Sequence, residues 1–158
     1  MARFTLPARL IVAWWPTSSQ PATLTGPTAA NITASTKMIG TSQGEGLAAL
    51  EGWQLDPQVL ETPDYVSLVV STVPGQVKVP VSKISLWMDT TDRTMYDAIA
   101  VNATGVVGFF FDGTATGKES KLYVVTCISK ERHFERDAGH QVTFGFSPAA
   151  PVLGAVVA

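Results

Sequence analysis

A glycine-rich stretch is the first of three residue sets whose types and spacing could do chemistry. Residues 113–118 read Gly-Thr-Ala-Thr-Gly-Lys, which is similar to a loop whose backbone N–H groups cradle phosphates. It has three residues between its glycines where that loop has four, and Glu119 stands where a hydroxyl would hold magnesium. An ordinary hairpin loop is the better interpretation, and no nucleotide or other cofactor is predicted.

The cysteine and the two histidines form the second set. Cys127, His133 and His140 could be imagined as metal ligands, but their spacings match no zinc pattern. One cysteine cannot form an internal disulfide. A Cys–His nucleophile would also need a third orienting group, and none accompanies this pair. We therefore predict neither a metal site nor a covalent catalyst.

Three carboxylates form the third set. Asp89, Asp92 and Asp97 lie close to one predicted helix, and paired carboxylates can do acid–base chemistry. Helix capping, the favourable field at a helix N-terminus and solvation explain them more simply. The chain is therefore expected to have no catalytic residues and not to be an enzyme.

Composition narrows the class of protein further. The chain has 158 residues, of which 46% are hydrophobic and only 15% charged, against about 25% charged in an average soluble chain. Its net charge of −2 does not suit a protein that grips nucleic acid through phosphates. No uninterrupted apolar run reaches the ~18–20 residues of a membrane helix, so no membrane insertion is expected. The shortage of charge predicts that other protein covers part of the surface.

Short alternating segments mark the strands of the first half. Residues 3–14 alternate between apolar and other side chains, which predicts a strand with one buried face. Residues 16–35 are rich in Pro, Thr, Ser, Ala and Gly without periodicity, which predicts a long ordered loop or arm. Two short strands or connectors are expected at 37–39 and 52–55, and a proline-containing loop at 56–63.

A β-hairpin is predicted over residues 65–88. Residues 65–73 alternate, Pro74-Gly75 is a typical turn dipeptide, and residues 76–88 supply the second strand. The apolar positions of that strand change phase near 80–83. A β-bulge there would explain both the change of phase and the proline.

The second half contains one predicted helix and three strands. The helix is expected over residues 90–101, capped by Asp89 or Thr90, because Met95, Ala98 and Ile99 form one apolar stripe. The predicted strands cover 105–111, 122–136 and 140–147, with a turn at 137–139. The uncharged tail 148–158 has no predicted neighbour that would bury it.

The predicted fold class is therefore mainly β, a β-sandwich or barrel with one flanking α-helix. One domain is expected to cover residues 1–158, with extended arms at 1–14 and 148–158. The densest charge run, 130–136, permits two interpretations. It is either a solvated strand face or a charged seam between subunits, where opposite charges fix the register.

Four stretches in a particular order carry a family resemblance. They are Ala13-Trp-Trp-Pro16 with the segment 26–34, Leu50-Glu-Gly-Trp53 leading to Tyr65, Val73-Pro-Gly-Gln-Val77, and Ser129-Lys-Glu-Arg132 through the strand 142–146 to the Pro/Ala/Val tail. In this order the chain resembles the tail tube protein (major tail protein) of long-tailed, non-contractile bacteriophages, particularly those of actinobacteria.

The resemblance implies a structural virion protein. Six copies would form a ring whose β-hairpins join into one barrel around a lumen, and stacked rings would make the tail tube through which genome DNA leaves. The implied partners are other copies, the tape-measure, tail terminator and baseplate or tail-tip proteins, with assembly in the bacterial host cytoplasm. DNA would pass without sequence-specific binding.

Candidate subunit contacts follow from the same resemblance. The arms 1–14 and 148–158, the loops 41–64 and the strand 65–88 are the expected interface elements. The individual candidates are Phe4, Leu6, Trp14, Trp15, Trp53, Tyr65, Val77, Lys83, Lys130, Glu131, Arg132, Glu135, Arg136, Val152 and Leu153.

Two alternative functions stay open at this point. The first is another component of a phage tail or injection system, such as a tail terminator, a tube initiator or a contractile-type inner tube protein. The second is a carbohydrate-binding β-sandwich, in which exposed tryptophans would stack on sugars: Trp14, Trp15, Trp53 and Trp87.

Overall fold

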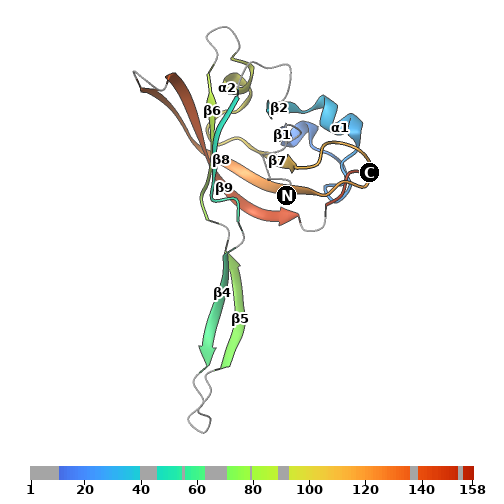
Figure 1. Cartoon of the computed structure of the whole chain (residues 1–158), viewed down its shortest axis with the longest axis vertical. Coiled ribbons are helices and arrows are strands. Elements are labelled where there is room, and N and C mark those ends of the chain that lie inside the picture. Colours follow the sequence, from blue (N-terminus) through green and yellow to red (C-terminus); the bar gives the residue numbers. More distant parts are fainter. Residues whose placement is uncertain are drawn as a thin grey trace, which may run out of the picture.

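A computed structural model describes residues 11–39, 46–54, 56–62, 71–78, 80–88, 93–135, 139–152 and 155–158 (Figure 1). The elements in chain order are β1 (Ile11–Pro16), the short 3-10 helix η1 (Thr17–Ser19), α1 (Ala29–Ala34), β2 (Thr36–Ile39), β3 (Gly46–Glu51), β4 (Asp56–Thr62), β5 (Ser71–Lys78), β6 (Ser82–Trp87), α2 (Thr94–Ala98), β7 (Thr104–Phe110), β8 (Ser120–Glu135) and β9 (Gly139–Val152).

The body of the molecule is a curled antiparallel sheet of seven strands in the order β2-β1-β7-β8-β9-β6-β3. A separate two-stranded ribbon, β4–β5, projects from this body and forms the lower end of the molecule in Figure 1. The predicted mainly β fold class is confirmed, and the curled sheet is consistent with a sandwich or barrel-like fold. The described chain adds a second short helix, α1, to the expected one.

Hydrophobic cores lie on both faces of the sheet. The first core contains Trp14, Ile84, Phe144 and Phe146. The second core lies on the opposite face and is built by the following side chains: Ala13, Trp15, Ile32, Val106, Phe110, Leu122, Ala155 and Val157. The sheet is therefore the middle layer of a three-layer body over part of its width.

Strand β1 is buried on both faces, so the prediction of one buried face is wrong for residues 11–14, while residues 3–10 of the predicted strand lie outside the described residues. Val12 and Trp14 enter the first core, while Ala13 and Trp15 enter the second. The tryptophan rings fit because the neighbouring strand carries glycine. A Cβ on Gly108 would lie 2.8 Å from a ring atom of Trp15, closer than packed side chains approach.

Helix α1 lies in the segment that was predicted to be an irregular loop or arm. It starts at a capping box, in which Asn31 N–H donates to Thr28 Oγ1 at 3.2 Å and Thr28 N–H donates to Asn31 Oδ1 at 3.0 Å. Trp15 Nε1 then donates to the Asn31 carbonyl at 3.0 Å. Only Ile32 of this helix is buried, so the sequence contains no apolar period to predict it.

Helix α2 is shorter than the predicted 90–101. Met95 and Ile99 are buried against the first core as expected, but Ala98 is exposed. The cap residue is Arg93, without a side-chain cap hydrogen bond. The expected caps Asp89 and Thr90 lie outside the described residues.

The predicted hairpin over 65–88 is wrong in its pairing. Strand β5 pairs with β4, in the segment predicted as a loop, and Pro74-Gly75 lies inside β5 at an irregularity of the pairing. Proline is tolerated there because both strands of a two-stranded ribbon are edges. The phase change near 80–83 is the point where the chain leaves this ribbon and enters β6 of the main sheet.

The three strands at the end of the chain are confirmed, and β9 is longer than the predicted 140–147. Strand β7 matches 105–111, and β8 matches 122–136 within one or two residues at each end. Val142, Phe144 and Phe146 are buried as expected, whereas His140 is only half-buried. Both short segments agree with the expectation of a strand or connector. Residues 37–39 lie in β2, and residues 52–54 follow the end of β3 at Glu51, while Leu55 lies outside the described residues.

The apolar tail is covered by its own subunit, contrary to the expectation that nothing local would bury it. Strand β9 continues to Val152 beside β8, and Ala155 and Val157 are buried in the second core. Backbone bonds hold this segment, because Val157 N–H donates to the Lys118 carbonyl at 2.9 Å and Gly117 N–H donates to the Val157 carbonyl at 2.8 Å. In its described part, the C-terminal segment is a layer of the fold.

Adjacent valines near the C-terminus test this role. Val157→Ala should lower the free energy of unfolding by about 2 kcal/mol, because buried methyl groups are lost from the second core (1% exposed). Val156→Ala is the matched control, since Val156 is 40% exposed, and should change stability by less than about 0.5 kcal/mol. Urea unfolding of both variants measures the difference. Equal losses would contradict the assignment.

Candidate assembly surfaces

One half of the main sheet is open at both sides. Strand β3 pairs only with β6 among the described strands, and β8 pairs with β7 only up to Thr126. Beyond that point the backbone of β8 makes two bonds with the turn before β7, both at Cys127. Residues 128–135 then pair only with β9. Within the part of the chain that the structure describes, the unit β8-β9-β6-β3 therefore has an unpaired backbone edge on each flank, and free edges are sites where another strand can pair.

The two faces of this four-strand unit differ in chemistry. One face belongs to the first core and is covered by α2 through Met95 and Ile99. The other is partly or fully exposed, and we call it the polar face: Glu51, Lys83, Ser85, Trp87, Glu131, His133, Gln141 and Thr143. None of these side chains is buried.

One side-chain hydrogen bond links two neighbouring strands of the polar face, and an ion pair lies within β8. The hydroxyls of Ser85 and Thr143 share a hydrogen bond at 3.0 Å. Glu131 Oε2 lies 3.8 Å from His133 Nε2, and both side chains are more than half exposed. Lys83 and Glu51 are cross-strand partners. The surface is thus hydrophilic and of mixed charge.

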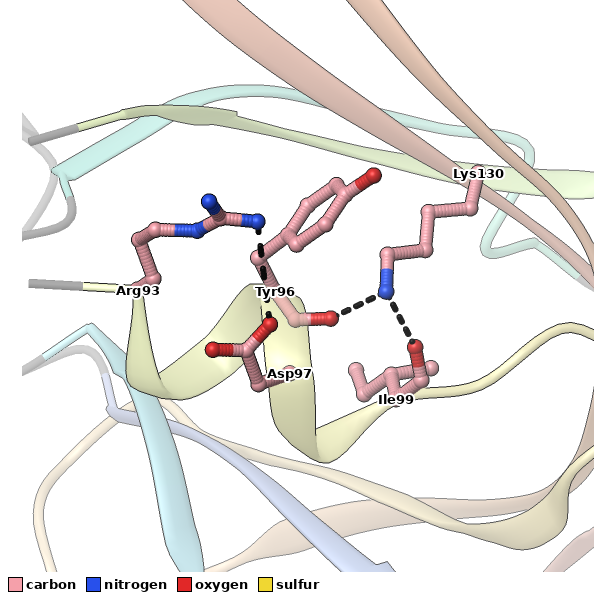
Figure 2. A network of polar contacts seen from close by, with 5 residues as sticks. All are labelled: Arg93, Tyr96, Asp97, Ile99 and Lys130. Carbon is pink, nitrogen blue, oxygen red and sulfur yellow. Dashed lines mark hydrogen bonds and ion pairs between the residues drawn. The ribbon is translucent and has the colours of Figure 1, made fainter. Parts of the chain in front are cut away.

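A cluster of cations surrounds Tyr96 on the opposite face, beside α2 (Figure 2). Lys130 Nζ lies 3.6 Å from the centre of the Tyr96 ring, Arg132 Cζ 4.2 Å and Arg93 Cζ 5.1 Å. All three distances fall within the range of cation–π attraction. Asp97 supplies one carboxylate, 3.8 Å from Arg93.

Lys130 joins β8 to the end of α2. Its ammonium donates to the carbonyls of Tyr96 and Ile99, the latter at 3.0 Å (Figure 2). The last carbonyls of a helix have no partner within the helix, and a cation there also meets the negative end of the helix dipole. Lys130 therefore fixes the position of Tyr96 relative to the sheet.

A shallow depression of about 220 Å³ lies beside Trp53. The Trp53 ring is 4.9 Å from Phe109 and 5.2 Å from Tyr123, both edge-on, and Trp53 Nε1 donates to the Lys83 carbonyl at 3.0 Å. The Tyr123 hydroxyl donates to the Trp53 carbonyl at 3.1 Å, and burial raises the pKa of Tyr123 above its ordinary value. Trp53 thus packs within its own subunit.

The predicted interface residues fall in several different places. Trp14 and Trp15 are 1% exposed within the two cores, so their side chains cannot contact a second copy without a rearrangement. Lys83 and Glu131 lie on the polar face, Lys130 and Arg132 lie beside Tyr96, and Val152 packs against the second core.

The remaining candidates lie in the β4–β5 ribbon, at the end of β8 or outside the described residues. Val77 is in β5 and Glu135 is in β8. Outside the described residues are Phe4, Leu6, Tyr65, Arg136 and Leu153.

The charge run 130–136 does not form one surface. Alternation along β8 sends Glu131 and His133 to the polar face and directs Lys130 and Arg132 toward Tyr96. Phe134 follows on the same side as Arg132 and is 79% exposed. Tyr96, Arg93 and Phe134 were missed by sequence reasoning, although two-residue alternation from Lys130 to Phe134 was a usable signal for the last.

The structure shows the surroundings of Cys127 and of the 113–118 stretch, which the sequence analysis considered for catalysis, metal binding or phosphate binding. Cys127 is buried, and its burial raises the pKa of the thiol, although a hydrogen bond with the Ser129 backbone and the charge of Lys130 lower it. The backbone of the 113–118 stretch bonds to the C-terminal segment through Gly117 and Lys118. Within the described ranges, no three His, Cys, Asp or Glu side chains are grouped to hold a metal ion.

Comparison with protein families decides the class. A family model described as phage tail tube protein matches residues 2–158. The chain belongs to this family. Phage tail tube proteins are structural components of the virion tail and generally not enzymes, and the family implies self-assembly into a tube. A search of curated proteins found no match.

Two points follow for the tail tube protein. In the parts of the chain that the structure covers, no helix is long and apolar enough to span a bilayer. Among the described residues, the unpaired strand edges, the polar face and the cations around Tyr96 are candidate surfaces for assembly.

The link between Lys130 and α2 can be tested by removing the ammonium group. Lys130→Met should lower the free energy of unfolding by about 1.5–3 kcal/mol, because two helix carbonyls lose a charged donor. Lys83→Met, at an exposed position, should change it by less than about 0.5 kcal/mol. Chemical denaturation of the two variants measures the difference. If Lys130→Met unfolds with the same free energy as the wild type, the role of Lys130 in holding α2 to β8 is contradicted.

Proposed function

We propose that six copies of this protein close into a ring and that the rings stack into the tail tube of a long-tailed, non-contractile phage of an actinobacterium. Genome DNA would leave through the lumen. The observation that carries this proposal is the four-strand unit β8-β9-β6-β3 with a free edge on each flank. Pairing residues 128–135 of one copy with β3 of the next removes both edges and closes a barrel.

The orientation of the sheet in such a barrel follows from its faces. The first-core face carries α2, and a layer of helix and loop on the inside would fill a narrow tube. The polar face must then line the lumen. Its hydroxyl and amide groups, with Lys83 against Glu51 and Glu131, give a wet and weakly acidic wall. Such a wall does not bind phosphate strongly, as a conduit for DNA requires.

The proposed partners are the other proteins of the tail. A tape-measure protein would lie inside the growing tube, and a terminator and a baseplate or tail-tip protein would close its ends. Assembly would take place in the host cytoplasm. A terminator, initiator or contractile-type inner tube protein would use the same edges. Copy number per particle separates a terminator from a tube protein, because a tube contains hundreds of copies and a terminator six.

A carbohydrate-binding module is the less favoured alternative. Trp14 and Trp15 are buried, and the Trp53 ring is packed against Phe109 and Tyr123. Trp87 is the most exposed of the four tryptophans, at 39%, and a stacking site for sugars needs several open aromatic faces.

Electron microscopy of the purified protein tests the assembly directly. We expect six-fold rings or tubes at high concentration, and longer tubes when the tape-measure and initiator proteins are supplied. A sample that stays monomeric under all these conditions would contradict the proposal.

Cysteine labelling tests which face lines the lumen. In a Cys127→Ala background, Thr143→Cys places a thiol on the polar face and Ala100→Cys places one at an exposed position after α2. In intact tubes, a maleimide on a large polyethylene glycol should react with Thr143→Cys at least about tenfold more slowly than in free subunits, because reaction requires access. Its reaction with Ala100→Cys should stay fast. Equal fast reaction at both positions would refute the lumen assignment.

A further inference from the structure

We propose that Asp112 and Gly113 form a site of spontaneous modification, at which the aspartate isomerises to isoaspartate as the protein ages. Asp112-Gly113 is the one Asp-Gly pair in the sequence. It lies in the turn between β7 and β8, at the start of the 113–118 stretch. The inference concerns the single subunit and does not depend on the proposed ring.

The reaction needs only these two residues and water. The backbone nitrogen of Gly113 attacks Cγ of the acid form of the Asp112 carboxyl. The carboxyl hydroxyl leaves with the proton of the N–H as water, and a cyclic succinimide forms. Because the two reacting atoms belong to adjacent residues, the step is intramolecular and is favoured by proximity.

Hydrolysis of the succinimide completes the change. Water attacks either carbonyl of the ring. Attack at the main-chain carbonyl breaks the original bond between that carbon and the Gly113 nitrogen, and leaves the nitrogen bonded to Cγ, which is isoaspartate. One water molecule is released and one is taken up, so mass and oxidation state are unchanged. The main chain becomes longer by one carbon atom.

The structure leaves both reacting groups accessible. Asp112 is exposed, and among the described residues its carboxyl makes no hydrogen bond or ion pair. Gly113 has a φ of +91°, and nothing lies within 4 Å of the position that a Cβ would take. Without a side chain, Gly113 has an unhindered nitrogen and a backbone that can adopt many conformations.

The turn also has little backbone support at this point. After β7 ends at Phe110, the first backbone hydrogen bond along the described chain is accepted by the Ala115 carbonyl, from Lys118 N–H at 3.2 Å. Segments with few protecting hydrogen bonds open locally at a low cost in free energy. The Gly113 nitrogen can therefore approach the Asp112 carboxyl without unfolding of the subunit.

Asp97 offers a contrast within the same chain. It is exposed like Asp112, but it lies within α2 and is followed by Ala98. Its N–H donates to the Arg93 carbonyl at 2.9 Å, and its carboxylate is 3.8 Å from the Arg93 guanidinium. Exposure alone is thus common to both aspartates, whereas the following glycine and the open turn belong to Asp112.

Isoaspartate at this position would disturb the C-terminal segment. The turn leads to Gly117 and Lys118, whose backbone groups bond to Val157, and Val157 is buried in the second core. Strands β7 and β8 fix the two ends of the turn, so a longer main chain between them changes how Gly117 meets Val157. In a structural component of the virion tail, this slow change would accumulate as the particle ages.

Incubation of the purified full-length chain at mildly acidic pH tests the site. Peptide mapping separates isoaspartate peptides from aspartate peptides of equal mass, and a protein isoaspartate methyltransferase methylates only the former. The samples are the folded wild type, the wild type in concentrated urea, and folded Asp112→Glu, which keeps the charge but would need a larger ring. Asp97 of the wild type is the internal control.

We expect isoaspartate at residue 112 and not at residue 97. Its rate of formation in the folded protein should be within about tenfold of the rate in urea, because the open turn adds little to the barrier. Asp112→Glu should react at least about tenfold more slowly. In the isolated modified protein, the Gly117 and Val157 amides should exchange hydrogen at least about tenfold faster than in the unmodified protein.

A folded protein that reacts more than about tenfold more slowly than the unfolded chain would overturn the site, since the fold would then protect it. Equal modification of Asp97 and Asp112 would overturn it as well. Both comparisons use the wild type alone, so they do not depend on the folding of a variant. Unchanged amide exchange in the modified protein would refute the effect on the C-terminal segment.

Discussion

The structure depends on a sheet that is covered on both faces over one half of its width and on one face over the other. In the first half, Trp14 and Trp15 project from adjacent positions of β1 into two separate cores. In the second half, β8-β9-β6-β3 keeps a polar, solvated face. Apolar burial stabilises the doubly covered half in each copy by itself. The singly covered half is free to meet other copies.

This division gives each subunit its own hydrophobic cores and also leaves strand edges without a pairing partner among the described residues. The second core uses α1 and the C-terminal segment as its outer layer, so the apolar tail is absorbed within the subunit. The open backbone edges of β3 and β8 remain. Edges of this kind are an aggregation hazard in a monomer. In the proposed ring these edges pair with strands of neighbouring copies.

The charged residues of β8 are also divided between the two faces of the sheet. The strand alternation of β8 separates Glu131 and His133 from Lys130 and Arg132, and places the two groups on opposite faces. Lys130 donates to carbonyls at the end of α2, while Arg132 lies over the Tyr96 ring. One charged run therefore contributes to a mildly polar wall on one side and to a cationic surface on the other. The small number of charges in this chain is consistent with each having a specific position.

The sequence by itself determined the mainly β class, the strands β7, β8 and β9, and the apolar contacts of Met95 and Ile99, because period-two and helical patterns are local. It did not determine that Pro74-Gly75 lies within a strand, that Trp14 and Trp15 serve two cores, or that the tail is buried. Those features depend on which strands pair and on what covers each face of the sheet. Pairing and covering involve residues that are distant in the sequence, so a local pattern does not specify them. Only the tertiary structure brings Arg93, Arg132 and Lys130 together around Tyr96. The attraction of a cation for an aromatic ring depends on their distance in space and corresponds to no fixed spacing in the sequence.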